Sequence, residues 1–147
     1  MAQVNAAAYQ FLLNALARIL VADNYQTNAG ANVAADWFGY AIEAEGAEFP
    51  LIVVEPSSDQ PASDVATEAK RNFRFNVVGV IEATNGPSGL LSLADDIKQA
   101  IGSFSRPAGF ISARLNSVDY VVNEKESALA WVICSVEIMA AETYRRA

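Results

Sequence analysis

Two glycines lie between a strand pattern and a helix pattern, in the segment ATNGPSGLL (83–91). A glycine-bearing turn at such a junction can hold a phosphate. A nucleotide-binding P-loop needs a lysine and a Ser or Thr directly after its last glycine, but Gly89 is followed by two leucines. A dinucleotide fingerprint needs three glycines at fixed spacing, and a KH-type GxxG loop needs basic surroundings. We therefore interpret the segment as a turn, with Ser88 as the N-cap of the next helix.

The chain has no histidine, which removes the commonest general base and the commonest metal ligand. Ser–His and Cys–His nucleophile pairs and histidine-bearing zinc sites are thereby excluded. The single cysteine, Cys134, lies in an alternating apolar strand pattern, where a thiol is usually inert packing. We expect no enzymatic activity, no bound cofactor and no metal site.

Carboxylates are the remaining candidates for chemistry. Asp95 and Asp96 are adjacent on a predicted helix, so their side chains diverge by about 100° and do not form a catalytic pair by themselves. Three glutamates fall in the glycine-bearing stretch 43–48, whose spacing lacks the calcium-loop pattern, and solvated acidic surface is the better interpretation. A small ligand-binding or enzymatic domain that uses Asp95, Asp96 or Glu82 stays open as an alternative, and it needs a pocket with converging polar groups.

Composition indicates one domain over residues 1–147 with a surplus of apolar surface. Hydrophobic residues make up 52% and charged residues 18% of the chain. No apolar run approaches the roughly 18 residues of a membrane span, so we expect the surplus to be buried in a protein–protein contact. The net charge of −7 argues against a protein that grips nucleic acid. An acidic wall is nevertheless compatible with DNA that slides past it.

Hydrophobic periodicity places the elements. The patterns predict, in chain order, a helix over 4–21, a weak strand over 37–42, strands over 49–54 and 73–82, a helix over 90–101 that ends at Gly102, and an antiparallel hairpin of strands over 113–124 and 128–142. We expect an α+β fold with a mixed, mainly antiparallel sheet and two helices packed on one face. The serine- and proline-rich stretch 56–70 is predicted to be a mobile loop.

The strand over 73–82 carries two further signals. Phe73, Phe75 and Val77 alternate with polar residues, but the second face becomes apolar at Val78. One end of this strand is therefore expected to be covered on both sides, by a neighbouring element or by another subunit. Gly79 is expected to mark a bulge or a close approach of another segment.

Aromatic residues and thinly spread arginines are the candidates for a contact surface, because aromatic residues and arginine are enriched at interfaces. The predicted interface residues are Trp37, Phe38, Tyr40, Arg71, Arg74, Asn76, Arg145 and Arg146. Core packing is an equally good interpretation of the aromatic stretch. We expect Trp37→Ala or Arg74→Glu to impair assembly more than folding.

The order of these elements resembles that of the tail terminator (tail completion) proteins of long-tailed bacteriophages. The helix VNAAAYQFLLNALARIL precedes the strand FPLIVVEP, and a polar segment leads to the strand FRFNVVGVIEA. The helix GLLSLADDIKQAI and a hairpin that ends in AWVICSVEIMAAETYRR follow. The resemblance spans nearly the whole chain.

The resemblance implies a ring, usually hexameric, that caps the tail tube and stops its polymerisation. It implies contacts with the tail tube protein and with a head-side connector or stopper, at the head–tail junction of a virion assembled in the host cytoplasm. DNA would pass through the ring without specific binding, and no membrane would be involved. Another head–tail joining protein of the phage neck is the alternative within this class.

Overall fold

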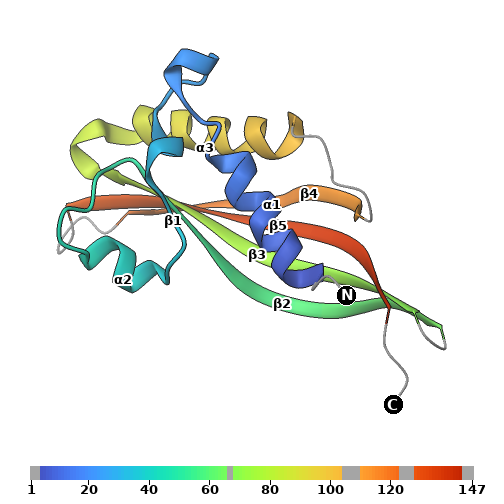
Figure 1. The fold of residues 1–147 in the computed structure, drawn as a ribbon. Coiled ribbons are helices and arrows are strands. Elements are labelled where there is room, and N and C mark those ends of the chain that lie inside the picture. Colours follow the sequence, from blue (N-terminus) through green and yellow to red (C-terminus); the bar gives the residue numbers. More distant parts are fainter. Residues whose placement is uncertain (1–3, 66–67, 104–109, 123–127, 144–147) are drawn as a thin grey trace.

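A mixed five-stranded sheet with the order β1-β2-β3-β5-β4 forms the centre of the fold (Figure 1). The computed structural model describes residues 4–65, 68–103, 110–122 and 128–143. The strands are β1 (Val33–Ala34), β2 (Leu51–Val65), β3 (Glu68–Glu82), β4 (Phe110–Val122) and β5 (Leu129–Thr143). The helices are α1 (Val4–Leu16), α2 (Phe38–Glu43) and α3 (Gly86–Ser103). Only β1 and β2 pair in parallel, and the other pairs of described strands are antiparallel, which confirms the predicted α+β class.

The helices α1 and α3 cover one face of the sheet (Figure 1), and the main apolar core lies between them and the strands. Phe73, Phe75 and Val77 of β3 point into this core, as their alternation predicts. The helices contribute Ala8, Phe11, Leu12, Leu16, Leu90, Leu93, Ala94, Ile97 and Ile101. Burial of large apolar side chains stabilises a fold by about 1.5–3 kcal/mol each, so this layer holds the domain together.

No helix in the described part of the chain is long and apolar enough to span a membrane.

Gly79 marks a close approach, as predicted, between β3 and α3. A Cβ atom at this position would lie 2.8 Å from Cδ2 of Leu93 and 3.0 Å from Cδ1 of Ile97. Both distances are shorter than carbon atoms normally tolerate, so the missing side chain lets α3 lie directly on the sheet.

The helix α2 covers one end of the opposite face (Figure 1) and corrects the prediction of a weak strand over 37–42. Phe38, Ala41 and Ile42 belong to a second apolar cluster that contains Val78 and Val80 of β3. These three positions have the spacing of one helix face. The strand was predicted because Phe38, Tyr40 and Ile42 also alternate in the sequence. The end of β3 that is apolar on both sides is thus covered by an element of the same chain.

The segment 56–70, predicted to be a mobile loop, is mostly paired strand, and this prediction of its secondary structure is wrong. β2 continues to Val65 and β3 begins at Glu68, while residues 66–67 lie outside the described residues. The pairing shifts register after Pro56 and again after Pro61. β1 pairs only with Ile52 and Val53, so the rest of β2 is an edge of the described sheet. An edge strand tolerates prolines because its outward amide positions need no partner in the sheet.

The segment 83–91 joins β3 to α3 through a short 3-10 turn over Ala83–Asn85, and both of its glycines belong to α3. Gly86 has φ +71°, a conformation that glycine adopts without strain, and α3 begins at this residue. The interpretation as a turn holds for residues 83–85, whereas residues 86–91 already form the start of α3. Ser88 lies inside the first turn of α3, so its prediction as the N-cap is wrong, and Gly102 lies within the last turn rather than after it.

Candidate functional site

The structure separates the predicted interface residues and places them on both faces of the sheet. The three aromatic residues lie at α2, and the next three residues of the prediction lie on β3. Arg145 and Arg146 lie outside the described residues. The prediction therefore names several separate surfaces and not one patch.

The aromatic residues at α2 divide between core and surface. The ring of Phe38 packs on Trp131 of β5, with ring centroids 5.5 Å apart. Trp37 is 54% exposed and Tyr40 is 70% exposed. Core packing thus accounts for Phe38, whereas Trp37 and Tyr40 leave apolar ring surface at the outside of α2, which is the residue type that protein contacts favour.

Arg71 and Arg74 lie on opposite faces of β3, because side chains alternate along a strand. Arg71 is on the α1 side, and its Nε lies 2.7 Å from Oδ1 of Asp59 on β2. Arg74 and the half-buried Asn76 point to the other face. The two arginines therefore cannot act in one site.

Arg74 belongs to a cluster around Glu137 on the face opposite α1 and α3. Glu137 of β5 is only 4% exposed. Its Oε2 lies 3.1 Å from Nε of Arg74, and its Oε1 lies 3.2 Å from Nη2 of Arg114. Asn116 donates a longer hydrogen bond of 3.4 Å to Oε2. The arginine side chains remain 45% and 67% exposed, so the cluster has a buried anion and cations that reach the surface.

The cluster fixes the charge of Glu137. Burial alone raises the pKa of its carboxyl, but hydrogen bonds from Arg114, Arg74 and Asn116 outweigh burial, and the net pKa lies below its ordinary value. The carboxyl is therefore ionised at neutral pH. Within this cluster, two positive charges therefore contact one negative charge, on a chain of net charge −7.

The sequence interpretation missed Glu137, although a signal for it exists. It is an isolated acid in the strongly apolar stretch WVICSVEIM, two positions from Ser135 on the side that faces away from the main core. A buried carboxylate needs cationic or polar partners, and Arg74 lies directly opposite on β3. The strand pairing, which the sequence does not reveal, is what joins the two.

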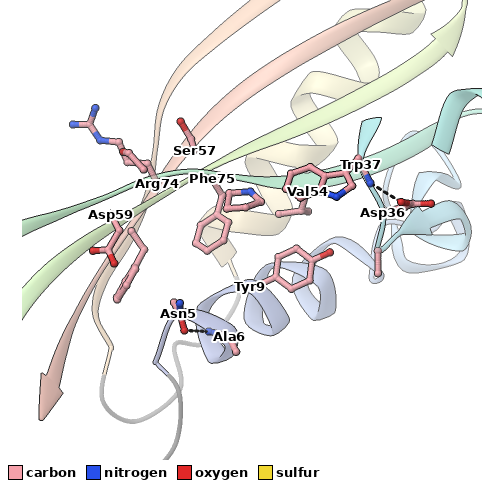
Figure 2. Close-up of a pocket in the computed structure, with 14 residues that line it drawn as sticks. Asn5, Ala6, Tyr9, Asp36, Trp37, Val54, Ser57, Asp59, Arg74 and Phe75 are labelled. Atoms are coloured by element: carbon pink, nitrogen blue, oxygen red, sulfur yellow. Dashed lines mark hydrogen bonds between the residues drawn. The ribbon is translucent and has the colours of Figure 1, made fainter. Parts of the chain in front are cut away.

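A groove of about 660 Å³ lies between the first turns of α1 and the edge strand β2 (Figure 2). The rings of Tyr9 and Phe75 lie in it with their centroids 6.3 Å apart. Burial, and secondarily the negative charge of Asp36, raise the pKa of the Tyr9 hydroxyl. Figure 2 shows Asp36 and Asp59 near its two ends and the Arg74 side chain directed away from it. Aromatic surface beside an open strand edge is the arrangement that extended peptides use.

The carboxylates proposed for chemistry do not come together. Asp96 is buried and accepts hydrogen bonds from the Gln26 and Thr27 amides and from the Thr27 hydroxyl. Asp95 is exposed and pairs with Lys98 at 3.2 Å, so the two aspartates diverge as predicted. Glu82 is exposed at the end of β3. Over the described ranges, no three carboxylate, thiol or imidazole side chains gather in a group that could hold a metal ion.

Cys134 lies in the main core, as its position in an apolar strand predicts. Burial raises the pKa of its thiol to about 12, with Lys98 lowering it and Asp119 raising it to smaller extents. A thiolate is the reactive form of cysteine, so the folded protein keeps this side chain inert at neutral pH.

Comparison with known proteins places the fold. No protein-family model matches the chain, and its sequence matches no curated protein. A solved structure that shares the fold is a chain of the virion of a native gene transfer agent (GTA) particle, with a TM-score of 0.64 and 16% identity. The similarity covers 94% of this chain and 94% of that chain. At this identity the similarity shows the fold alone.

Proposed function

We propose that this protein is a structural component of a phage-like virion that forms a hexameric ring on the end of the tail tube. The ring terminates tube polymerisation and joins the tail to the head-side connector. The similarity to a chain of a gene transfer agent virion over 94% of both chains carries this proposal. The order of elements, which resembles tail terminator proteins, supplies the specific role within the virion.

Three surface features of the fold support the proposal that copies of this protein assemble. Trp37 and Tyr40 expose large rings, and beyond Val53 β2 ends the described sheet with an open edge. Among the described helices, α2 alone covers the face with the Glu137 cluster, and it does so at one end. Each of these surfaces can be buried in a subunit contact, which is a destination for the apolar surplus of the composition.

The proposed partners follow from this role. They are further copies of the chain, the tail tube protein and a head-side connector or stopper, at the head–tail junction of a virion assembled in the host cytoplasm. DNA passes through the ring without specific binding, because the net charge of −7 repels phosphates. The protein acts without catalysis, cofactor or membrane.

A head–tail joining protein of the neck is the second candidate, since the same similarity to a virion chain supports it equally. Light scattering during size-exclusion chromatography, followed by negative-stain imaging, tests the proposal. Closed rings, free or on the ends of tail tubes, are expected. Rings found on the portal side without any tube contact would favour the joining protein. A stable monomer that binds a small molecule, with the groove near Tyr9 as its site, would overturn both.

A further inference from the structure

On the part of the second sheet face that no described helix covers, two arginines contact a single carboxylate. We call the surface formed by Arg74, Arg114 and Asn116 around Glu137 the arginine face. Two guanidinium groups share one carboxylate there, while the chain as a whole has a net charge of −7. The arginine face is thus a local exception to the charge of the protein.

The arginines of this face keep most of their hydrogen-bonding capacity. A guanidinium carries five N–H donors, and Glu137 accepts from Nε of Arg74 and from Nη2 of Arg114. In the described part of the chain, Glu137 is the sole acidic side chain that pairs with either arginine. Because a buried anion holds both groups in place, their free donors are positioned for a further carboxylate, the group that arginine binds bidentately.

Asn72 is a half-buried neighbour of this surface. It lies on the same side of β3 as Arg74, opposite Met139 of β5. Its Oδ1 is buried and has no hydrogen-bond partner among the described residues. An unpaired buried acceptor costs free energy, but the fold itself already shields this atom from solvent, so the docking contact does not rest on it.

The same chain carries a segment of the matching charge. The last residue of α2 and the turn that follows it expose Glu43, Glu45 and Glu48, and we call this stretch the acidic turn. None of these glutamates forms an ion pair with a described residue. We propose that the acidic turn of one copy docks on the arginine face of the next copy, an inference that rests on the proposed self-assembly and names its contact.

The two surfaces cannot meet within one chain. α2 lies over the end of β3 that contains Val80, whereas Arg74 lies further along the strand. From Val80 to Arg74, β3 extends about 20 Å. A contact between two different surfaces of identical copies is heterologous, and such contacts repeat from copy to copy and close into a ring when the rotation allows. This is the type of contact that a ring needs.

Charge reversal of the acidic turn tests the proposal directly. The variant Glu43→Lys/Glu45→Lys/Glu48→Lys alters no intrachain ion pair of the described residues, so its thermal unfolding is expected to match that of the unaltered protein. Its association, measured by light scattering over a dilution series, is expected to weaken at least tenfold. The matched control is Lys98→Glu, a single reversal on α3 on the other side of the sheet, which is expected to assemble normally. Unaltered assembly of the triple variant would overturn the proposal.

Mixing two defective variants tests that the contact is heterologous. Arg114→Ala keeps the Arg74–Glu137 pair and removes one guanidinium from the arginine face, and it is expected to assemble poorly. In a mixture, the intact acidic turn of the Arg114→Ala protein can dock on the intact arginine face of the acidic-turn variant. Each mixed pair can therefore form this contact only once. Pairs of twice the monomer mass that do not grow into rings are expected.

The outcomes separate this inference from the proposed function. Rings that form equally well in all variants leave the ring proposal intact and overturn the docking contact. An unaltered protein that stays monomeric at every concentration overturns the proposed function itself. A third outcome concerns nucleic acid: if Arg114→Ala lowers binding of duplex DNA but leaves assembly unchanged, the arginine face serves phosphates and not a second copy.

Discussion

Two buried carboxylates, one on each side of the sheet, show how differently its faces are closed. Asp96 on α3 accepts hydrogen bonds of 2.8 to 3.1 Å from Gln26 and Thr27. Glu137 on β5 is held by two arginines whose side chains stay about half exposed or more. The partners of Asp96 are used up within the fold, whereas those of Glu137 keep donors at the surface. We call the side that α1 and α3 cover the closed face, and the side with the Glu137 cluster the open face. A polar group on the closed face therefore serves folding. A polar group on the open face also positions hydrogen-bond donors that a neighbouring molecule can contact.

The largest effect is expected on the closed face. Asp96→Ala removes an acceptor of hydrogen bonds from two backbone amides and a hydroxyl, and a hydrogen bond to a charged group contributes about 1.5–3 kcal/mol. Because the loop can relax toward water, we expect a net loss of about 3 kcal/mol in the free energy of unfolding, measured by urea denaturation. The adjacent Asp95→Ala, which removes an exposed pair with Lys98, is the control and should cost less than about 0.5 kcal/mol. Equal stability of the two variants would mean that Asp96 does not hold the loop.

A smaller effect is expected at the open face. Glu137→Gln keeps the shape of the side chain and removes the charge that both arginines contact. Because the arginines are largely hydrated and can turn to water, we expect a loss of about 1–2 kcal/mol. Glu82→Gln, at an exposed position of β3, is the control, and we expect it to leave the urea midpoint unchanged. A loss at Glu137 as large as that of Asp96→Ala would show that the open face is as closed as the other.

The same contrast explains what the sequence could predict. Apolar alternation predicts that Phe73, Phe75 and Val77 share the core face of their strand. The three- and four-residue spacing of apolar residues likewise predicts the buried faces of α1 and α3, because these patterns are local in the sequence. Glu137 and Asp96 draw their partners from strands and loops far away in the chain, so their roles depend on pairing and register. The prediction of a loop over 56–70 was wrong for a related reason. Serine and proline are typical of loops, but edge strands also tolerate them, and the sequence does not show that this segment is an edge strand.

Low pH is expected to lower the free energy of unfolding through Glu137 on the open face. The folded pKa of Glu137 lies below its ordinary value of 4.5, so its ionised form stabilises the fold above that pH. This stabilisation is lost as the pH falls from about 4.5 through the lowered folded pKa. Unfolding free energies measured across that window should fall more steeply for the unaltered protein than for Glu137→Gln. Parallel curves for the two proteins would mean that the arginines do not lower the pKa.

The smallest change in stability, with the clearest change in assembly, is expected at the outside of α2. Trp37 is 54% exposed, so Trp37→Ala removes little buried surface and should cost less than about 1 kcal/mol. Trp131→Ala is the matched control, because its partly buried ring packs against Phe38 under α2. We expect it to cost more than Trp37→Ala, at or below the lower end of the about 3–5 kcal/mol typical of buried tryptophans.

Thermal unfolding and light scattering on the same samples compare the two tryptophans. Trp37→Ala should assemble poorly while it unfolds almost normally, whereas Trp131→Ala should lose stability first. Arg74→Glu, which the sequence offered as an equivalent test, does not separate these effects, because it places a second carboxylate beside the buried Glu137. A collapse in the stability of Trp37→Ala with normal assembly would assign Trp37 to internal packing. Exposed rings at α2 would then have no part in the contact, and the arginine face with its acidic turn would have to hold the ring by charge alone.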